Sequence, residues 1–112
     1  MSIEFNGKSI ETDKNGYLVN AEDWNKELAE HVAQSEGIAL TQKHWDLLEY
    51  LRDEYFNNNA TQPNTRHICK AMSDKWGTSV AQKDVYDLFP KDPSKQGGRI
   101  AGLPESRRKG GY

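Results

Sequence analysis

The chain has 112 residues, enough for one modest hydrophobic core, so we expect a single domain over residues 1–112. Its net charge of -2 argues against a general nucleic-acid binder, and its one cysteine excludes an internal disulfide. The sequence has no apolar run long enough for a membrane span and no signal-peptide pattern, which with the single cysteine predicts a cytoplasmic protein.

The charge is unevenly distributed, and this divides the domain into a body, residues 1–90, and a C-terminal arm, residues 91–112. The arm carries six basic and two acidic residues, a net charge of +4, which leaves -6 for the body. A basic arm can dock on its own acidic body or bind an anionic partner.

The first residues predict a β-hairpin. Asn6-Gly7 is the favoured pair for a two-residue turn, because both residues tolerate positive φ. The apolar residues Ile3, Phe5 and Ile10 can then share one face of the hairpin. A second turn at residues 13–16 precedes another short extended segment, residues 17–19.

Apolar periodicity predicts two long helices between residues 20 and 59. We expect Asn20 to cap the first, with Gly37 ending it, and Thr41 to cap the second, with the asparagines at 57–59 stopping it. The side chains expected to be buried are Trp24, Leu28 and Val32 on the first helix and Trp45, Leu48, Leu51 and Tyr55 on the second, with Leu47 and Phe56 at its edges.

Two more helices are expected before residue 90. Asn64 or Thr65 caps a third long helix that ends at residues 77–79, and a short helix follows as far as Phe89. The expected inner faces are Ile68, Cys69, Met72 and Trp76 on the third helix and Val85, Leu88 and Phe89 on the last. The predicted fold is therefore mainly α, with a small N-terminal β-hairpin followed by a compact bundle of four or five helices.

The C-terminal arm shows neither helical nor strand periodicity from residue 95 onward, so we expect it to be irregular. Pro90 and Pro93 prevent the preceding helix from continuing into it. The apolar residues at 100–104 predict that the arm docks on the body at its middle, and the glycine-rich basic end predicts a mobile terminus. The basic triplet at 107–109 is typical of a solvated tail, with anion or nucleic-acid contact as the alternative.

The single thiol, Cys69, lies on the apolar face of the third predicted helix. This position favours a buried structural cysteine, because free cysteine is among the most buried residue types. Arg66 and Lys70 are near in sequence, so a reactive thiol, which needs exposure and a positive environment, stays an alternative.

Metal and nucleotide sites are not indicated. The three histidines, at positions 31, 44 and 67, lie on three different predicted helices without metal-ligand spacing, so we expect no metal. Gly97-Gly98 follows no strand and is not a nucleotide-binding signature, so we expect no cofactor.

Several segments occur in a distinctive order along the whole chain. They are Phe5-Asn-Gly-Lys, Thr12-Asp-Lys-Asn-Gly-Tyr-Leu, the Trp24 helix, Glu36-Gly-Ile-Ala-Leu-Thr, His44-Trp, Leu51-Arg-Asp-Glu-Tyr, Arg66 with Cys69-Lys-Ala-Met, Tyr86 with Leu88-Phe-Pro, and Lys95-Gln with Ile100-Ala-Gly-Leu-Pro. In this order and spacing they resemble the DsrC/TusE family, the small sulfur-relay proteins that include DsrC (DsvC), the gamma protein associated with dissimilatory sulfite reductase.

The resemblance implies a short N-terminal β-hairpin on an orthogonal helical bundle with a helix-turn-helix-like part and a flexible C-terminal arm. In this family a cysteine at the penultimate arm position carries a persulfide. DsrC members add a second arm cysteine, and TusE members pass sulfur toward the thiolation of tRNA wobble uridine. Here the two positions are matched by Gly111 and Gly98, which cannot hold sulfur, and the arm after Pro104 is longer than usual.

The first hypothesis is therefore a non-catalytic, partner-binding or regulatory family member. Its arm would contact another protein of the sulfur-relay or sulfite-reductase type. The residues expected to bind are Arg99, Ile100, Leu103, Arg107, Arg108 and Tyr112.

Two alternatives stay open. One is a sulfurtransferase or sulfur carrier, in tRNA 2-thiouridine formation or dissimilatory sulfur metabolism, which requires an exposed, reactive Cys69. The other is a DNA-binding regulator that uses the helix-turn-helix-like part and the basic arm. Enzymatic activity is undecided at this point, because the family implies a sulfurtransferase but the carrier cysteine is absent.

Overall fold

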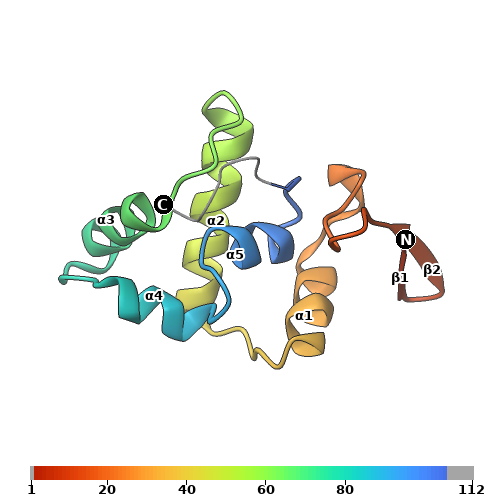
Figure 1. Cartoon of the computed structure of the whole chain (residues 1–112), viewed down its shortest axis with the longest axis horizontal. Coiled ribbons are helices and arrows are strands. Elements are labelled where there is room, and N and C mark those ends of the chain that lie inside the picture. The colour runs from red at the N-terminus through yellow and green to blue at the C-terminus, as the bar shows by residue number, and fades with distance from the viewer. Residues whose placement is uncertain (1, 106–112) are drawn as a thin grey trace.

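A two-stranded antiparallel hairpin and five α-helices make up the fold of residues 2–105, the part of the chain that this computed structural model describes (Figure 1). The predicted mainly α class with an N-terminal β-hairpin is confirmed. None of the helices within residues 2–105 has both the length and the apolar character needed to cross a membrane.

The hairpin forms where the Asn6-Gly7 pair predicted it. Strands β1 (Ser2–Phe5) and β2 (Lys8–Glu11) pair so that Ile3 lies opposite Ile10. Asn6 and Gly7 both have positive φ, 51° and 75°, as a tight two-residue turn requires. The apolar face of the hairpin packs in a small cluster on the body, formed by Ile3, Phe5, Ile10, Leu18 and Leu28.

The first helix begins later than predicted. Ala21–Asp23 form one turn of 3-10 helix, Trp24 is extended, and α1 runs over Lys26–Ser35. Asn25 caps α1 in place of Asn20, because its Oδ1 accepts the Leu28 N–H at 2.7 Å, whereas the Asn20 side chain makes no cap bond. The break leaves the Trp24 indole free to reach the C-terminal arm.

The next three helices lie where the periodicity placed them: α2 (Gln42–Asn57), α3 (Thr65–Trp76) and α4 (Gln82–Leu88). Asn64 caps α3 by accepting the His67 N–H at 2.9 Å, and Gly77, with φ of 68°, ends it. The prediction for the buried face of α2 was partly wrong. Leu47, placed at its edge, is fully buried, whereas Trp45 and Tyr55 are only half-buried.

A fifth helix, α5 (Lys95–Ile100), contradicts the prediction of an irregular arm from residue 95. Asp92 Oδ1 accepts the backbone N–H groups of Ser94 and Lys95 at 2.9 Å each. Pro93 follows Asp92, and its fixed φ suits the first turn of a helix. Pro93, which was expected only to stop the preceding helix, therefore lies with Asp92 at the start of a new one.

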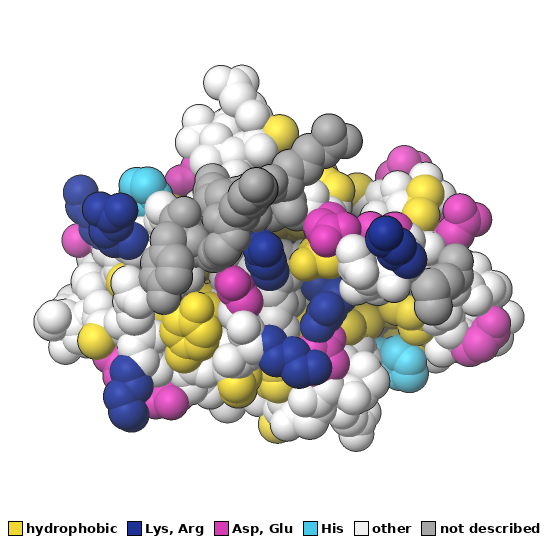
Figure 2. Space-filling view, viewed as in Figure 1, with side chains coloured by type: hydrophobic (Ala, Val, Ile, Leu, Met, Phe, Trp, Pro, Cys, Tyr) yellow, Lys and Arg dark blue, Asp and Glu magenta, His cyan; other side chains and the backbone are white. Residues whose placement is uncertain are grey.

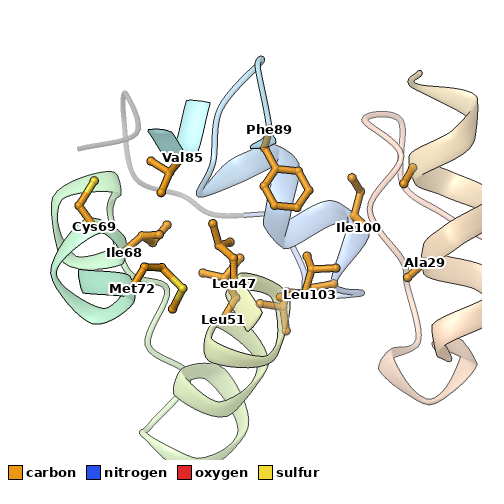
Figure 3. Close-up of a cluster of buried hydrophobic side chains, with 13 residues drawn as sticks. Ala29, Leu47, Leu51, Ile68, Cys69, Met72, Val85, Phe89, Ile100 and Leu103 are labelled. Carbon is orange, nitrogen blue, oxygen red and sulfur yellow. The ribbon is translucent and has the colours of Figure 1, made fainter. Parts of the chain in front are cut away.

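One hydrophobic cluster joins α5 to the four other helices. Figure 1 shows α5 in the centre of the bundle, between α1 and α2. The buried members of the cluster, most of them labelled in Figure 3, are Ala29, Ala33, Leu47, Leu48, Leu51, Ile68, Cys69, Met72, Val85, Phe89, Ile100, Ala101 and Leu103. The first part of the arm is therefore part of the core.

Candidate functional site at the root of the C-terminal arm

Ile100 and Leu103, two of the predicted binding residues, lie in the chain's own core. Each side chain is 1% exposed. They attach the arm to the body, as the apolar residues at 100–104 led us to expect. A partner could contact these two side chains only if the segment were displaced, and their partner-binding role stays a prediction.

Three side-chain donors from the body hold backbone carbonyl groups of the arm; we call Trp24, Arg52 and Gln62 the carbonyl clamp. Trp24 Nε1 donates to Ile100 O at 2.8 Å, and Arg52 Nη1 donates to Ala101 O at 2.7 Å. Gln62 Nε2 donates to Pro104 O at 2.8 Å. Because the donors come from three separate segments, the clamp fixes both the position and the direction of the arm.

Two clamp members also support each other. The Arg52 guanidinium lies 3.8 Å from the centre of the Trp24 ring, in a cation–π contact. Desolvation by burial lowers the pKa of Arg52 from its usual value. The ordinary pKa of arginine is so far above neutral that the side chain remains a charged donor.

Gly102 allows the chain to pass close to the indole. Its φ is 78°, in the left-handed region that favours glycine, and a Cβ at this position would overlap the Trp24 side chain. Leu103 N–H then bonds back to Gly98 O at 2.9 Å, which closes the end of α5. Gly102 therefore serves both the backbone turn and the close contact with Trp24.

A polar network attaches the outer side of α5 to the end of α1. The Glu36 carboxylate accepts from Gln96 Nε2 at 2.8 Å, from Arg99 Nε at 3.2 Å and from Arg99 Nη2. Gln96, which is 3% exposed, accepts the Lys91 N–H at 3.0 Å through its Oε1. Arg99, another predicted binding residue, is thus already engaged by the body.

The last described residue is also held in place. Asn15 Nδ2 donates to both Glu105 carboxylate oxygens, at 2.9 and 3.0 Å. With Gln62 on the neighbouring carbonyl, this contact fixes the point from which the rest of the chain continues. Three predicted functional positions, Arg107, Arg108 and Tyr112, and the glycine at 111, lie outside the described residues.

Gly98, which the resemblance matches to an arm cysteine, differs from its neighbour Gly97. A Cβ on Gly97 would lie 3.1 Å from Leu51 Cδ1, so α5 and α2 approach each other too closely for a larger residue. A Cβ on Gly98 would meet no atom within 4 Å. Packing therefore leaves room for a Cβ at residue 98 but not for one at residue 97.

Cys69 has the environment of a structural thiol. It is 8% exposed on α3, and desolvation by burial, with a further contribution from the Asp84 carboxylate, raises its pKa. In Figure 3 it lies at the opposite end of the core from Ile100. A reactive thiol needs the reverse conditions, exposure and a lowered pKa, so this geometry does not support the alternative that depends on Cys69.

Metal and DNA sites gain no support from the part of the chain that the structure describes. Within residues 2–105, no three histidine, cysteine or acidic side chains come together as metal ligands do. The DNA alternative needs a helix-turn-helix-like part, but in the contacting pair α3–α4 the second helix exposes two carboxylates, Asp84 and Asp87, and its Lys83 pairs with Asp87 at 3.3 Å. An acidic second helix is poorly suited to a DNA phosphate backbone.

The clamp and the network were missed by sequence reasoning. Trp24 was assigned to the core only, and no role was assigned to Arg52, Gln62 or Glu36. Their partners are backbone carbonyls and side chains far away in sequence, which no spacing rule identifies. The one usable signal was Asp92-Pro93, a typical helix start just before α5.

Residues 4–108 match the family model described as DsrC like protein. The chain belongs to this family. Among DsrC-like proteins, it is 45% identical over 102 residues to sulfurtransferase TusE of Escherichia coli O6:H1 (strain CFT073), with 90% of this chain and 93% of that protein covered. It is 44% identical over 104 residues to sulfurtransferase TusE of Yersinia pestis, with 92% and 94% covered.

Solved structures of DsrC share the fold. The NMR structure of Allochromatium vinosum DsrC superposes with a TM-score of 0.85 at 37% identity, covering 96% of each chain. The crystal structure of the oxidized gamma-subunit of dissimilatory sulfite reductase (DsrC) from Archaeoglobus fulgidus has a TM-score of 0.87 at 32% identity, covering 96% of this chain and 98% of that one. A chain in the crystal structure of dissimilatory sulfite reductase I has a TM-score of 0.77 at 31% identity. The family fold implied by the resemblance is confirmed.

Proposed function

We propose that this chain is a non-catalytic DsrC-like protein that binds a protein of the sulfur-relay or sulfite-reductase type through its C-terminal arm. The proposal rests on two observations taken together, the attachment of the arm to the body and the absence of a thiol from the arm. Side chains of the body hold the root of the arm, yet the arm contains no thiol, and the only cysteine is buried in α3.

The attachment of the arm supports a binding role. The carbonyl clamp, the Glu36 network and the Asn15–Glu105 contact use body side chains between Asn15 and Gln62 to fix where residues 106–112 begin. Such fixing is useful when the terminal residues must reach a defined place on another molecule, because a preorganised segment loses less entropy on binding.

The relatives support the class of partner. Proteins of similar sequence are named sulfurtransferase TusE, and a similar chain occurs in the crystal structure of dissimilatory sulfite reductase I. A carrier needs a thiolate on the arm, whereas a binding protein does not. The glycines at 98 and 111 therefore remove the sulfur chemistry while leaving a protein-binding role possible.

The test is capture of relay and sulfite-reductase-type proteins from the same genome by the full chain and by a variant that ends at Glu105. We expect the full chain to retain a partner that the shortened variant loses, while both give the same thermal unfolding midpoint. Equal capture by the two chains would contradict a binding role for the arm.

A sulfurtransferase remains the second candidate, because the names of the relatives at 44–45% identity favour it. In this chain it would have to use Cys69. Rapid alkylation of the native protein by a thiol reagent would support this candidate, and alkylation only after unfolding would argue against it.

A further inference from the structure

The turn at residues 13–16 holds the last described residue of the arm. The Asp13 carbonyl accepts the Gly16 N–H at 3.1 Å, which closes the turn. The Asp13 carboxylate accepts the Asn15 N–H at 2.8 Å, which fixes Asn15 within it. From this position Asn15 Nδ2 donates to both carboxylate oxygens of Glu105, at 2.9 and 3.0 Å.

The Asn15–Glu105 contact depends on the amide of Asn15. An ionised carboxylate such as Glu105 can only accept hydrogen bonds, so its partner must donate them. Asparagine has an NH2 group that does so, whereas aspartate, of nearly the same shape, has two acceptor oxygens and a negative charge. Exchange of the amide for a carboxylate at position 15 would therefore replace both hydrogen bonds with repulsion.

The residue after Asn15 makes this exchange chemically accessible. In an Asn-Gly pair the glycine nitrogen can attack the asparagine Cγ, because glycine has no Cβ to hinder the approach. A bond forms between the Gly16 nitrogen and Asn15 Cγ, and Nδ2 leaves as ammonia together with the proton of the Gly16 N–H. Water then opens the resulting succinimide to aspartate or isoaspartate, so no oxidant or reductant is needed.

The local structure allows the reaction. Asn15 is exposed and Gly16 is partly exposed, so water reaches both. Gly16 has a φ of 87°, and a Cβ there would lie 3.3 Å from Arg99 Cδ, so both the backbone and the packing favour glycine at this position. The bond from the Gly16 N–H to Asp13 must open before the attack, and turns of exposed residues open at little cost in free energy.

A second Asn-Gly pair, Asn6-Gly7, provides an internal reference. Asn6 is also exposed, and it lies in the turn between β1 and β2. Conversion of Asn6 adds the same negative charge to the same N-terminal segment but leaves the Asn15–Glu105 contact intact. The two sites therefore separate the effect of the contact from the effect of the charge.

We propose that Asn15 is a site of spontaneous deamidation, and that the carboxylate formed there breaks the Asn15–Glu105 contact and loosens the root of the arm. Acidic and basic side chains lie next to each other on this face of the molecule (Figure 2). Lys91 and Arg99 line a cleft of about 310 Å³ together with Asn15 and Glu105. Arg99 is already paired with Glu36, and an exposed pair with Lys91 would contribute little, so the lost hydrogen bonds decide the outcome.

The first test asks whether Asn15 is converted. The full chain is incubated in mildly alkaline buffer, digested with trypsin and mapped by mass spectrometry, and a sample digested without incubation gives the background. Trypsin cuts after Lys8 and Lys14, so the two Asn-Gly pairs fall on separate peptides, and the second peptide also contains Asn20 and Asn25. We expect Asn15 to convert before Asn20 and Asn25, which precede larger residues. Equal rates at these three, or an intact Asn15 after Asn6 has been converted, would overturn the proposed site.

The second test asks what the new charge does, and it compares Asn15→Asp with the matched control Asn6→Asp. The readout is hydrogen exchange of the Leu103 amide, which bonds to Gly98 O at the end of α5. We expect this amide to exchange about twofold to fivefold faster in Asn15→Asp than in Asn6→Asp, with a smaller difference at high salt. Thermal unfolding checks that both variants fold.

Equal or slower exchange in Asn15→Asp would overturn the inference, because it would show that Lys91 or Arg99 neutralises the new carboxylate and the arm root stays closed. The inference goes beyond the proposed function and does not depend on it. Neither readout uses a partner protein, so a failure here leaves the capture experiment unaffected. Equal capture by the full and shortened chains would likewise leave both of these tests valid.

Discussion

Trp24 shows how much one side chain contributes at the arm. It packs against the core, its ring supports Arg52, and its Nε1 satisfies the Ile100 carbonyl. A hydrogen bond of this kind contributes only about 1 kcal/mol net, but an unpaired buried carbonyl costs about 1–3 kcal/mol. The sensitive feature is therefore the carbonyl that would be left unpaired.

We expect Trp24→Phe to lower the free energy of unfolding by about 1–3 kcal/mol more than the control Trp45→Phe, because only the first change leaves a buried carbonyl without its donor. Urea denaturation measures both. The amide of Leu103, which bonds to Gly98 O, should also exchange faster with solvent in Trp24→Phe. Equal loss in the two variants would show that the indole acts through its size alone.

The glycine pair in α5 allows a second comparison. In a helix interior alanine is more favourable than glycine by about 1 kcal/mol, and this gain applies at both positions. At Gly97 the new methyl group would press on Leu51 and Leu47, whereas at Gly98 it would enter open space. We expect Gly98→Ala to be more stable than Gly97→Ala by about 1–3 kcal/mol in urea denaturation, the usual cost of overpacking. The reverse order would mean that α5 is not packed on α2 as described.

At the scale of the elements, His44 joins the start of α2 to the end of α4. The Thr41 N–H can only donate, so His44 Nδ1 accepts it, at 3.0 Å, and Nε2 carries the proton that is donated to Leu88 O, at 3.0 Å. The imidazole must therefore be neutral in the folded protein. Desolvation by burial lowers its pKa, against a smaller opposite effect of the Leu88 carbonyl.

This makes the stability of the fold dependent on pH. The unfolded chain, with a histidine pKa near 6.5, takes up a proton before the folded one does. Stability is therefore fully present above pH 6.5 and falls as the pH drops from there toward the lower folded pKa. We expect urea denaturation at about pH 7.5 and about pH 5.5 to show a smaller loss in His44→Gln than in the parent chain. An identical loss in both would exclude His44 as the cause.

The elements also differ in how well the sequence predicted them. The hairpin and α2–α4 follow from the Asn6-Gly7 turn, from apolar periodicity and from caps such as Asn64, all of which act locally. The helix α5 was missed because two of its six residues are glycines that add no apolar side chain to a periodic pattern. Its stability comes from burial against α2 and α1, which only the folded chain provides.

The candidate site was less predictable than the fold. The sequence indicated the arm, its docking at Ile100 and Leu103, and the missing thiols. It did not indicate the donors Arg52 and Gln62, because a hydrogen bond to a backbone carbonyl depends on where the chain passes and not on the residue type that supplies the carbonyl. The resemblance identified the family that the comparisons confirm, but it could not supply these contacts.

At the scale of the whole molecule, the chain has the architecture of the DsrC-like family, and the proposed function assigns it no sulfur chemistry. The body holds the root of the arm through its core, the carbonyl clamp and the Glu36 network. By sequence the arm carries a net positive charge, and the one thiol is buried on the inner face of α3. On the proposed function, such a protein would occupy a binding site on a partner without transferring sulfur to it.

The measurement that tests this account most directly is intact-mass analysis of the native protein after incubation with a persulfide donor. We expect no added sulfur on the parent chain, and added sulfur on Gly111→Cys, which restores a thiol at the position that the resemblance assigns to the carrier. Parent protein unfolded in urea, where Cys69 becomes accessible, controls for the donor. A sulfur adduct on Cys69 of the native parent chain would contradict the account, because the protein would then be a carrier with its thiol at a new site.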